Sequence, residues 1–133
     1  MDTKIAVIVR DDLQVWQRLN VSAFTVSGIA GTQDVIGEPY QDSSGNDYLP
    51  MIKQPILIFE AGRDALRSVL RKALDRRLEI SVYTEELFST GNDVENRAAV
   101  RAVAYEDLNL AGLALWGKKK SIDQVLKGLS LHS

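Results

Sequence analysis

The sequence predicts a single α/β domain over residues 1–133, with helices on both faces of a mainly parallel, four-stranded sheet. Short aliphatic runs recur along the chain, amphipathic helical patterns alternate with them, and one segment rich in turn residues interrupts the alternation. Such alternation favours parallel pairing in a three-layer α/β/α arrangement, because the crossover helices cover both faces of the sheet.

Four strands are expected from near-continuous apolar runs, which indicate strands that are covered on both faces. Lys4–Val9 reads KIAVIV and Pro55–Glu60 reads PILIFE, and Ile80–Tyr83 and Leu110–Trp116 complete the set. Pro55 suits the start of a strand, since the first residue need not donate to the ladder.

Four helices are predicted, at 13–30, 62–77, 92–103 and 121–129. The helix at 62–77 has the clearest apolar stripe. In the helix at 13–30, the apolar or small residues at helical spacing are Val15, Leu19, Ala23, Val26 and Ala30. Asn92 with Glu95 resembles a capping box, and Ser121 suits the N-cap of the last helix.

Residues 31–54 differ in composition from the rest of the chain, since they contain prolines, glycines and a DSSGN turn signal at 42–46. The turn lies between Tyr40 and Tyr48, so a small β-hairpin is expected there.

The composition limits the chemistry that the chain can carry. A formal charge of −2 gives no overall attraction to nucleic acid, and we expect no nucleic-acid partner. There is no cysteine, and the only histidine, His132, is expected to be frayed near the chain end. Metal chemistry would therefore have to rest on carboxylates alone, which suit Mg²⁺ or Ca²⁺ and not Zn²⁺, and we assign no cofactor and no metal site.

Neither a membrane-spanning run nor a signal peptide is evident, because Met1–Lys4 leads directly into the first strand. The expected location is the cytoplasm, with no membrane partner.

Three polar clusters follow predicted strands: Arg10–Asp12, Glu60–Arg63 and Thr84–Glu86. Ligands of open α/β sheets bind outside the carboxyl ends of the strands, so parallel strands would gather these clusters on one edge. A structural alternative exists for each cluster. Asp11 or Asp12 suits a helix cap, and Thr84 suits the cap of a following turn.

Arg10 is not explained by capping, because a cation is unfavourable at a helix N-terminus. It is expected to pair with a carboxylate or to bind an anion. The loop up to residue 93 adds Thr90, Asn92 and Asp93, which could line a pocket or could be ordinary loop residues. Ser89 lacks a histidine nearby in the sequence that would activate it as a nucleophile.

Two basic features remain, the arginines of the helix at 62–77 and the run Lys118–Lys120. They could steer a phosphate-rich partner, but the polar face of an amphipathic helix explains the arginines at least as well.

Several blocks resemble a bacterial domain of unknown function, family two thousand (DUF2000): VIVRDDLQVWQRLNVSAF, IGEPYQDSSGNDYLP, VYTEELFSTGND and KSIDQVLKGLSLH. That family is similar in fold to the class 2 peptidyl-tRNA hydrolases. Val7–Leu13 resembles the first strand of these enzymes and the motif after it, and Ala114–Gly117 resembles their last strand. The resemblance implies a mixed sheet whose last strand is antiparallel.

The chemistry of the hydrolases is not reproduced in these residues. Their functional lysine has no equivalent in Gln14–Asn20, which contains Arg18 but no lysine. Their strand-end aspartate would fall at Thr84 or Glu85, and the threonine leading into their last strand falls near Gly112.

Two functions follow from these observations. The first is a small-ligand pocket at the strand ends that includes Arg10, Thr84, Thr90, Asn92 and Asp93. Arg10 would hold an anionic group, and Asp12 or Glu85 would act as general base if the site is hydrolytic. The alternative is a non-catalytic homodimeric module that associates through residues 31–54.

Overall fold

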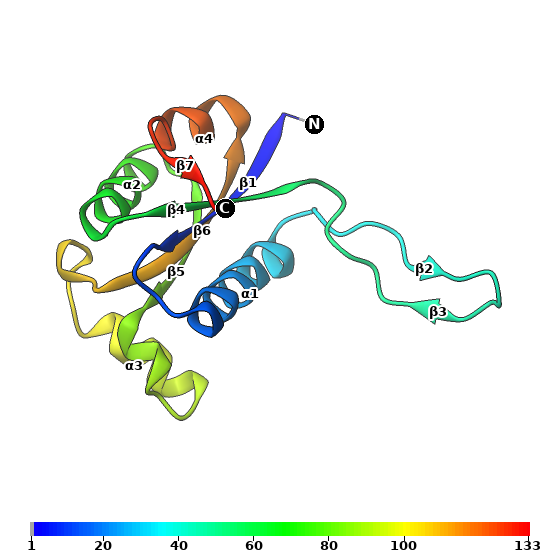
Figure 1. Cartoon of the computed structure of the whole chain (residues 1–133), viewed down its shortest axis with the longest axis horizontal. Helices are drawn as coiled ribbons and strands as arrows, with labels where there is room; N and C mark the ends of the chain where they lie inside the picture. Colours follow the sequence, from blue (N-terminus) through cyan, green and yellow to red (C-terminus); the bar gives the residue numbers. More distant parts are fainter. Residues whose placement is uncertain (1) are drawn as a thin grey trace.

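The computed structural model describes residues 2–133 and contains a five-stranded sheet with helices on both faces (Figure 1). The strands of the sheet are β1 (Thr3–Arg10), β4 (Ile56–Ala61), β5 (Glu79–Thr84), β6 (Leu110–Lys118) and β7 (Ser130–Leu131). The helices are α1 (Val15–Thr32), α2 (Arg63–Asp75), α3 (Asp93–Arg101) and α4 (Lys119–Val125). The 3-10 turns are η1 (Glu85–Phe88) and η2 (Tyr105–Asp107), and β2 (Tyr40–Gln41) and β3 (Asp47–Tyr48) form a separate hairpin.

The strand order in the sheet is β5-β6-β1-β4-β7. Strand β6 runs antiparallel to both β1 and β5, which confirms the expected direction of this strand. The sheet is mixed and contains all four predicted strands, but the prediction is wrong in two respects: a fifth strand, β7, is present, and only β1 with β4 pair in parallel. Burial patterns show that β6 is covered on both faces, but they carry no information about its direction.

The chain end is not frayed, contrary to expectation. Strand β7 pairs with β4 at Phe59 and Glu60, and the His132 backbone N–H donates to the Ile58 carbonyl at 2.8 Å. A two-residue strand has no periodicity that a sequence pattern could reveal.

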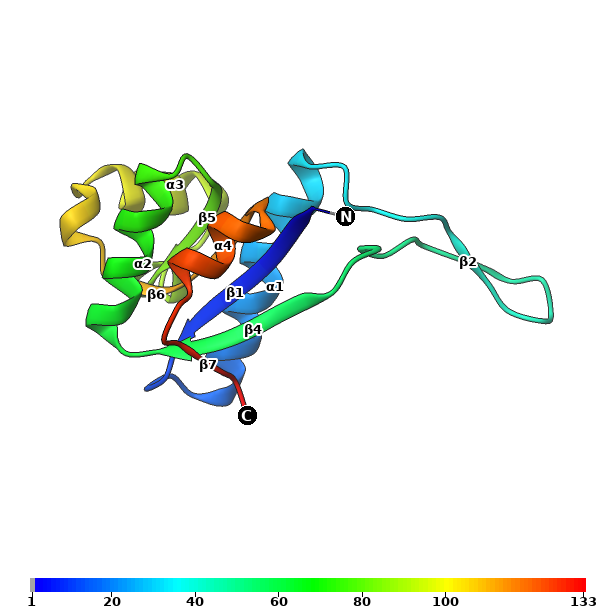
Figure 2. The same cartoon turned by 90° about the horizontal axis from the view of Figure 1, so that it is seen from above.

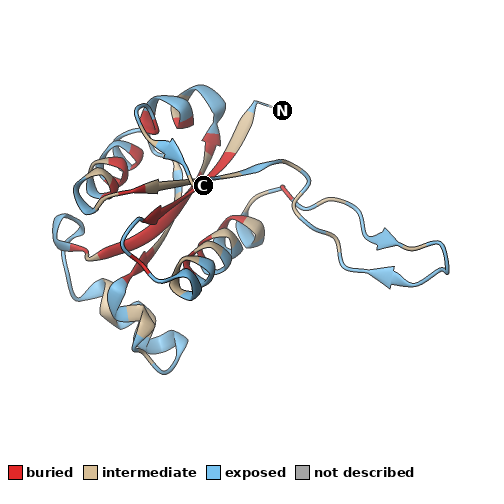
Figure 3. Cartoon of the chain, in the orientation of Figure 1, coloured by how far each residue is buried: buried red, intermediate tan, exposed pale blue. Residues whose placement is uncertain are grey.

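The central strands β1 and β6 are buried on both faces, as the apolar runs predicted (Figure 3). The same prediction is wrong for Pro55–Glu60, because Ile56 and Ile58 of β4 remain partly exposed. Along β1, Ile5, Val7 and Val9 belong to the core under α1, whereas Ala6 and Ile8 belong to the core under α2 and α4. The alternation of side chains along a strand explains why one strand contributes to both cores.

Helix α1 packs through a different stripe from the predicted one. Its buried residues are Val21, Thr25 and Ile29, whereas Val15 and Leu19 are 72% and 66% exposed. The Thr25 hydroxyl donates to the Val21 carbonyl at 2.7 Å, so its burial leaves that group satisfied. Part of the predicted stripe, at Val15 and Leu19, therefore forms an apolar face of α1 that is open to solvent.

Helix α2 buries most of its predicted apolar stripe, including Leu66, Val69 and Leu70, whereas Leu74 at the end of the stripe is exposed. Helix α4 differs from the prediction, since it begins at Lys119 and ends at Val125. Ser121 is thus inside the helix and is not its N-cap, and the backbone N–H of Lys119 donates to the Asp2 carbonyl at 2.7 Å.

The predicted hairpin is present, with Tyr40 paired to Tyr48, and it projects away from the sheet (Figure 2). We call residues 34–54 the arm. Within the described residues 2–133, no helix combines the length and apolar character needed to cross a membrane.

The turn of the arm gives a pH prediction. The Tyr48 hydroxyl donates to Asp42 at 2.7 Å, and this bond, with those from Asn46, lowers the pKa of Asp42 from 3.8 to about 2. Because the pKa of Asp42 is lower in the folded state than its ordinary value of 3.8, the ionised carboxylate stabilises the turn at pH values above 3.8. This stabilisation is lost as the pH falls toward 2. In Tyr48→Phe, carboxyl NMR should show the Asp42 pKa rising toward 3.8, whereas Tyr40→Phe should leave it unchanged.

Candidate functional site

Arg10 is at the carboxyl end of β1 and is only 4% exposed. Its Nε donates to Asp12 at 2.5 Å, its Nη2 donates to Glu85 at 3.0 Å, and its Nη1 donates to the Leu110 carbonyl at 3.0 Å. The ends of β1 and β5 and the start of β6 therefore meet at one guanidinium. We call Arg10, Asp12, Arg63, Glu85 and Asn109 the strand-end cluster.

Asn109 and Arg63 complete this cluster. The Asn109 side chain donates to Glu85 at 3.1 Å and accepts from Arg63 at 2.6 Å. Arg63, the first residue of α2, also lies 4.0 Å from Asp12. The predicted convergence of the three strand-end segments is confirmed by these contacts.

Charge pairing dominates the electrostatics of the strand-end cluster. Burial alone would lower the pKa of Arg10, but its hydrogen bonds and ion pairs with Asp12 and Glu85 outweigh burial and raise that pKa. The hydrogen bond from Arg10 holds the pKa of Asp12 below its usual value. Of the two roles expected for Arg10, pairing with a carboxylate is confirmed.

Capping does not explain the aspartates after β1. The N-cap of α1 is Gln14, whose backbone N–H donates to the Gln17 side chain at 2.9 Å. Asp12 instead holds Arg10, and the Asp11 backbone donates its N–H to the Ala61 carbonyl at 3.0 Å and accepts from Arg18 at 2.7 Å.

Thr84 ends β5 and precedes the 3-10 turn η1, which is the cap position that the sequence suggested. Its side chain makes no capping bond, however, and it is buried. Among the described residues, its hydroxyl has no hydrogen-bond partner.

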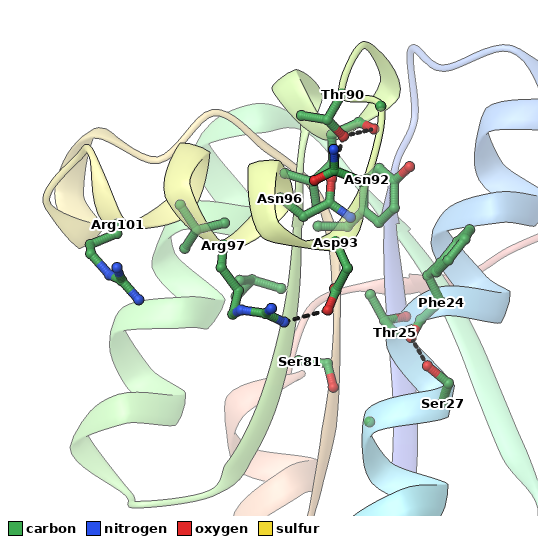
Figure 4. A pocket seen from close by; sticks show the side chains of 16 residues that line it. Phe24, Thr25, Ser27, Ser81, Thr90, Asn92, Asp93, Asn96, Arg97 and Arg101 are labelled. Atoms are coloured by element: carbon green, nitrogen blue, oxygen red, sulfur yellow. Dashed lines mark hydrogen bonds and ion pairs between the residues drawn. The ribbon is translucent and has the colours of Figure 1, made fainter.

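A cleft of about 810 Å³ lies between α1, β5 and α3 (Figure 4). Its volume is within the range of small-molecule sites. Its apolar lining includes Phe24 and Tyr83, whose ring centroids are 5.9 Å apart. The polar lining is formed by Thr25, Ser27, Ser81, Thr90, Asn92, Asp93, Asn96, Arg97 and Arg101.

Gly28 determines how closely α1 approaches β5 beside the cleft. A Cβ at this position would lie 2.4 Å from the Ser81 hydroxyl oxygen, so an alanine here would require the Ser81 side chain to rotate away. The absence of a side chain at Gly28 thus permits the close approach that shapes one wall.

The three loop residues predicted as ligand contacts all line this cleft, and each also has a local partner. Asn92 caps α3 by accepting from the Glu95 backbone at 2.9 Å, as the capping pattern predicted. Thr90 donates to Asn96, and Asp93 pairs with Arg97.

Arg101 differs from these residues. Among the described residues, its guanidinium has no ion-pair or hydrogen-bond partner, so the lining of the cleft includes one unpaired cation.

The predicted site residues therefore separate into two groups. Arg10, Asp12 and Glu85 join the strand-end cluster, and Thr90, Asn92 and Asp93 join the cleft. Within the described part of the chain, the Thr84 side chain makes no hydrogen bond to the cluster and does not line the cleft. No hydrogen bond or ion pair among residues 2–133 connects the two groups directly.

Sequence reasoning missed Asn109, Phe24 and the cleft arginines. Arg97 and Arg101 follow Asp93 at intervals of four, a spacing that places all three on one helix face and could have revealed them. Asn109 carried no comparable signal, because it stands alone before an apolar strand.

Among residues 2–133, no group of three or more His, Asp or Glu side chains is placed to hold a metal ion. The arginines of α2 that could have formed a basic site, Arg67 and Arg71, are exposed on its solvent face. Lys118–Lys120 lie where β6 passes into α4.

Comparison with known proteins finds one family whose sequence model, described as "Protein of unknown function (DUF2000)", matches residues 3–133. Among solved structures, this chain is similar to the protein of unknown function Atu0240 from Agrobacterium tumefaciens strain C58. The two share 45% sequence identity with a TM-score of 0.96, over 100% of this chain and 99% of the other. No curated protein matches the chain.

Proposed function

We propose that this chain, which belongs to the DUF2000 family, binds a small organic anion in the cleft between α1, β5 and α3. The observation that carries the proposal is the combination of an aromatic wall with the unpaired Arg101 in one concave site. Such a site suits a ligand with an apolar body and a carboxylate or phosphate group.

The aromatic wall supports the apolar half of this ligand. Phe24 is 60% exposed although it lies against Tyr83, so one of its ring faces is open to solvent. Burial raises the pKa of Tyr83 above its ordinary value of 10.0, so its phenol stays neutral well into the alkaline range. A flat apolar group would cover the exposed ring of Phe24, while Tyr83 is already buried beneath it, and the apolar area removed from water would stabilise a complex.

The polar wall supports the anionic half. Asp93 neutralises Arg97, and Arg101 adds one further positive charge within the cleft. Thr90, Asn92 and Asn96 contribute hydroxyl and amide groups that can orient a ligand. Three of the polar residues of this wall, Thr90, Asn92 and Asp93, are ligand contacts that the sequence predicted. Asn96 and Arg97 are the partners of Thr90 and Asp93.

The proposal is binding and not hydrolysis. Asp12 and Glu85, the predicted base candidates, are tied to Arg10, and the lowered pKa of Asp12 weakens it as a base near neutral pH. The fold likeness to class 2 peptidyl-tRNA hydrolases remains a prediction and carries no part of this proposal.

Titration with phenyl phosphate, followed by NMR, tests the proposal. Arg101→Gln is expected to weaken binding about fivefold or more, because it removes a charge-assisted hydrogen bond of about 1–2 kcal/mol. Arg71→Gln is the matched control, since Arg71 is an exposed arginine of α2 outside the cleft.

Two further probes separate the halves of the ligand. Inorganic phosphate lacks the ring and benzyl alcohol lacks the charge, so each should bind more weakly than phenyl phosphate. Equal affinity of Arg101→Gln and Arg71→Gln for phenyl phosphate would contradict the assignment.

A further inference from the structure

The arm exposes large apolar side chains that its own protomer does not cover. Tyr40 and Tyr48 are half exposed, Met51 is exposed, and Leu49 is 86% exposed. Figure 3 shows the arm as an almost wholly exposed extension of the chain.

Among residues 2–133, hydrogen bonds tie the arm to the body of the chain only at its base, where Gln54 bonds to Thr3 and Val35 to Gln33. Gly37 donates its backbone N–H to Met51, Gln41 donates to Asp47, and Asp42 holds the turn, so residues 36–51 bond only among the arm's own residues in the part of the chain that the structure describes. A two-stranded hairpin is marginally stable in water without a surface to pack on. The arm therefore lacks the cover that would stabilise it.

An open apolar face is present on the body of the same chain. Ile58 of β4 is in register with the buried Val7 of β1, so its side chain lies on the α1 side of the sheet. Helix α1 packs on β6, β5 and β1 and leaves Ile58 partly exposed beside Val15 and Leu19. Together with His132, these residues line a groove of about 260 Å³, which we call the α1–β4 groove.

The charges of the two surfaces are complementary. The arm carries four acidic residues and one lysine. Helix α1 carries no acidic residue, and its single charged residue is Arg18, which lines the groove. An acidic hairpin is thus attracted to this face.

The positions of the two surfaces also agree with two-fold symmetry. The arm begins just after the carboxyl end of α1, whereas the groove lies beside its amino-terminal half. If two α1 helices lie antiparallel across a two-fold axis, the end of one helix meets the start of the other. The arm of each copy then lies next to the groove of its partner.

We propose that the chain forms a homodimer in which the arm of each copy packs into the α1–β4 groove of the other. The occupant is a second copy because one chain carries both surfaces. Under two-fold symmetry the contact between arm and groove forms twice, once with the arm of each copy. This interface does not depend on the ligand of the cleft between α1, β5 and α3.

Analytical ultracentrifugation between about 1 and about 100 µM protein is expected to show a monomer–dimer equilibrium with a single dissociation constant. Leu49→Asp in the arm and Leu19→Asp in the groove should each raise that constant at least tenfold, because each buries a charge in an apolar contact. Val94→Asp is the control, since Val94 is equally apolar and 70% exposed on α3, away from both surfaces.

The absence of cysteine allows a second, positional test. A chain with Leu49→Cys and Leu19→Cys should form an intermolecular disulfide under mild oxidation, whereas one with Leu49→Cys and Val94→Cys should not. A monomer at about 100 µM overturns the proposal. A dimer that tolerates both aspartate variants, or cross-links equally in both cysteine chains, also overturns it.

Discussion

Arg10→Met is expected to lower the free energy of unfolding by about 3 kcal/mol, because it removes hydrogen bonds to two carboxylates and to a buried carbonyl. Asp12 and Glu85 are about half exposed and can be rehydrated, but the Leu110 carbonyl is left without its donor. Urea unfolding measures this loss.

Arg63→Met is the matched control for this prediction. Arg63 contacts the same cluster through Asn109 and Asp12, but it is half exposed, so its loss should cost less than about 1 kcal/mol. An equal decrease in the free energy of unfolding in Arg10→Met and Arg63→Met would contradict the role of Arg10 in connecting β1, β5 and β6.

The pH dependence of the Arg10→Met effect follows from the pKa of Asp12. This pKa is lowered in the folded state, so the stabilisation is present above the ordinary value of 3.8 and is lost as the pH falls below it. The difference in unfolding free energy between wild type and Arg10→Met should therefore stay constant above about pH 5 and narrow as the pH falls from about 5 to about 2.

Gly112→Ala is expected to cost about 3 kcal/mol, since this position has no space for a side chain. A Cβ there would lie 2.7 Å from the Ile8 carbonyl oxygen and 2.5 Å from Val21 of α1. The first of these atoms belongs to the backbone of the central strand and cannot move without disturbing the sheet.

Gly31→Ala is the control for the glycine prediction. No atom lies within 4 Å of a Cβ built at Gly31, which is exposed on α1. Alanine has the higher helix propensity, so this variant should gain up to about 1 kcal/mol. Thermal unfolding of both variants tests the pair, and equal stability of the two would contradict the close packing at Gly112.

Gly112 also bears on the resemblance to the hydrolases, which stays a prediction. The resemblance placed a threonine of the hydrolases near this position. In this chain α1 and β1 approach the strand so closely that no side chain fits there.

Much of the fold could be predicted from local patterns. The runs at Lys4–Val9 and Leu110–Trp116 identified buried strands, and the DSSGN turn identified the hairpin, because burial and turn chemistry are local properties. Strand direction and the edge strand β7 depend on long-range pairing, which periodicity does not record.

The site was predictable in part for a similar reason. The meeting of Arg10 and Glu85 followed from their places at strand ends. The cleft depends on Phe24, which lies far from α3 in the sequence. It also depends on which face of α1 packs on the sheet, and the apolar spacing predicted the wrong face.

The central claim is that the cleft, and not the strand-end cluster, is the ligand site. A map of backbone amide shifts on titration with phenyl phosphate tests it most directly. We predict that the shifts concentrate in residues 81–83 and 90–101, with the amides of Arg10 and Asp12 unchanged. Shifts confined to Arg10, Asp12 and Glu85, or none at about 10 mM ligand, would contradict the claim.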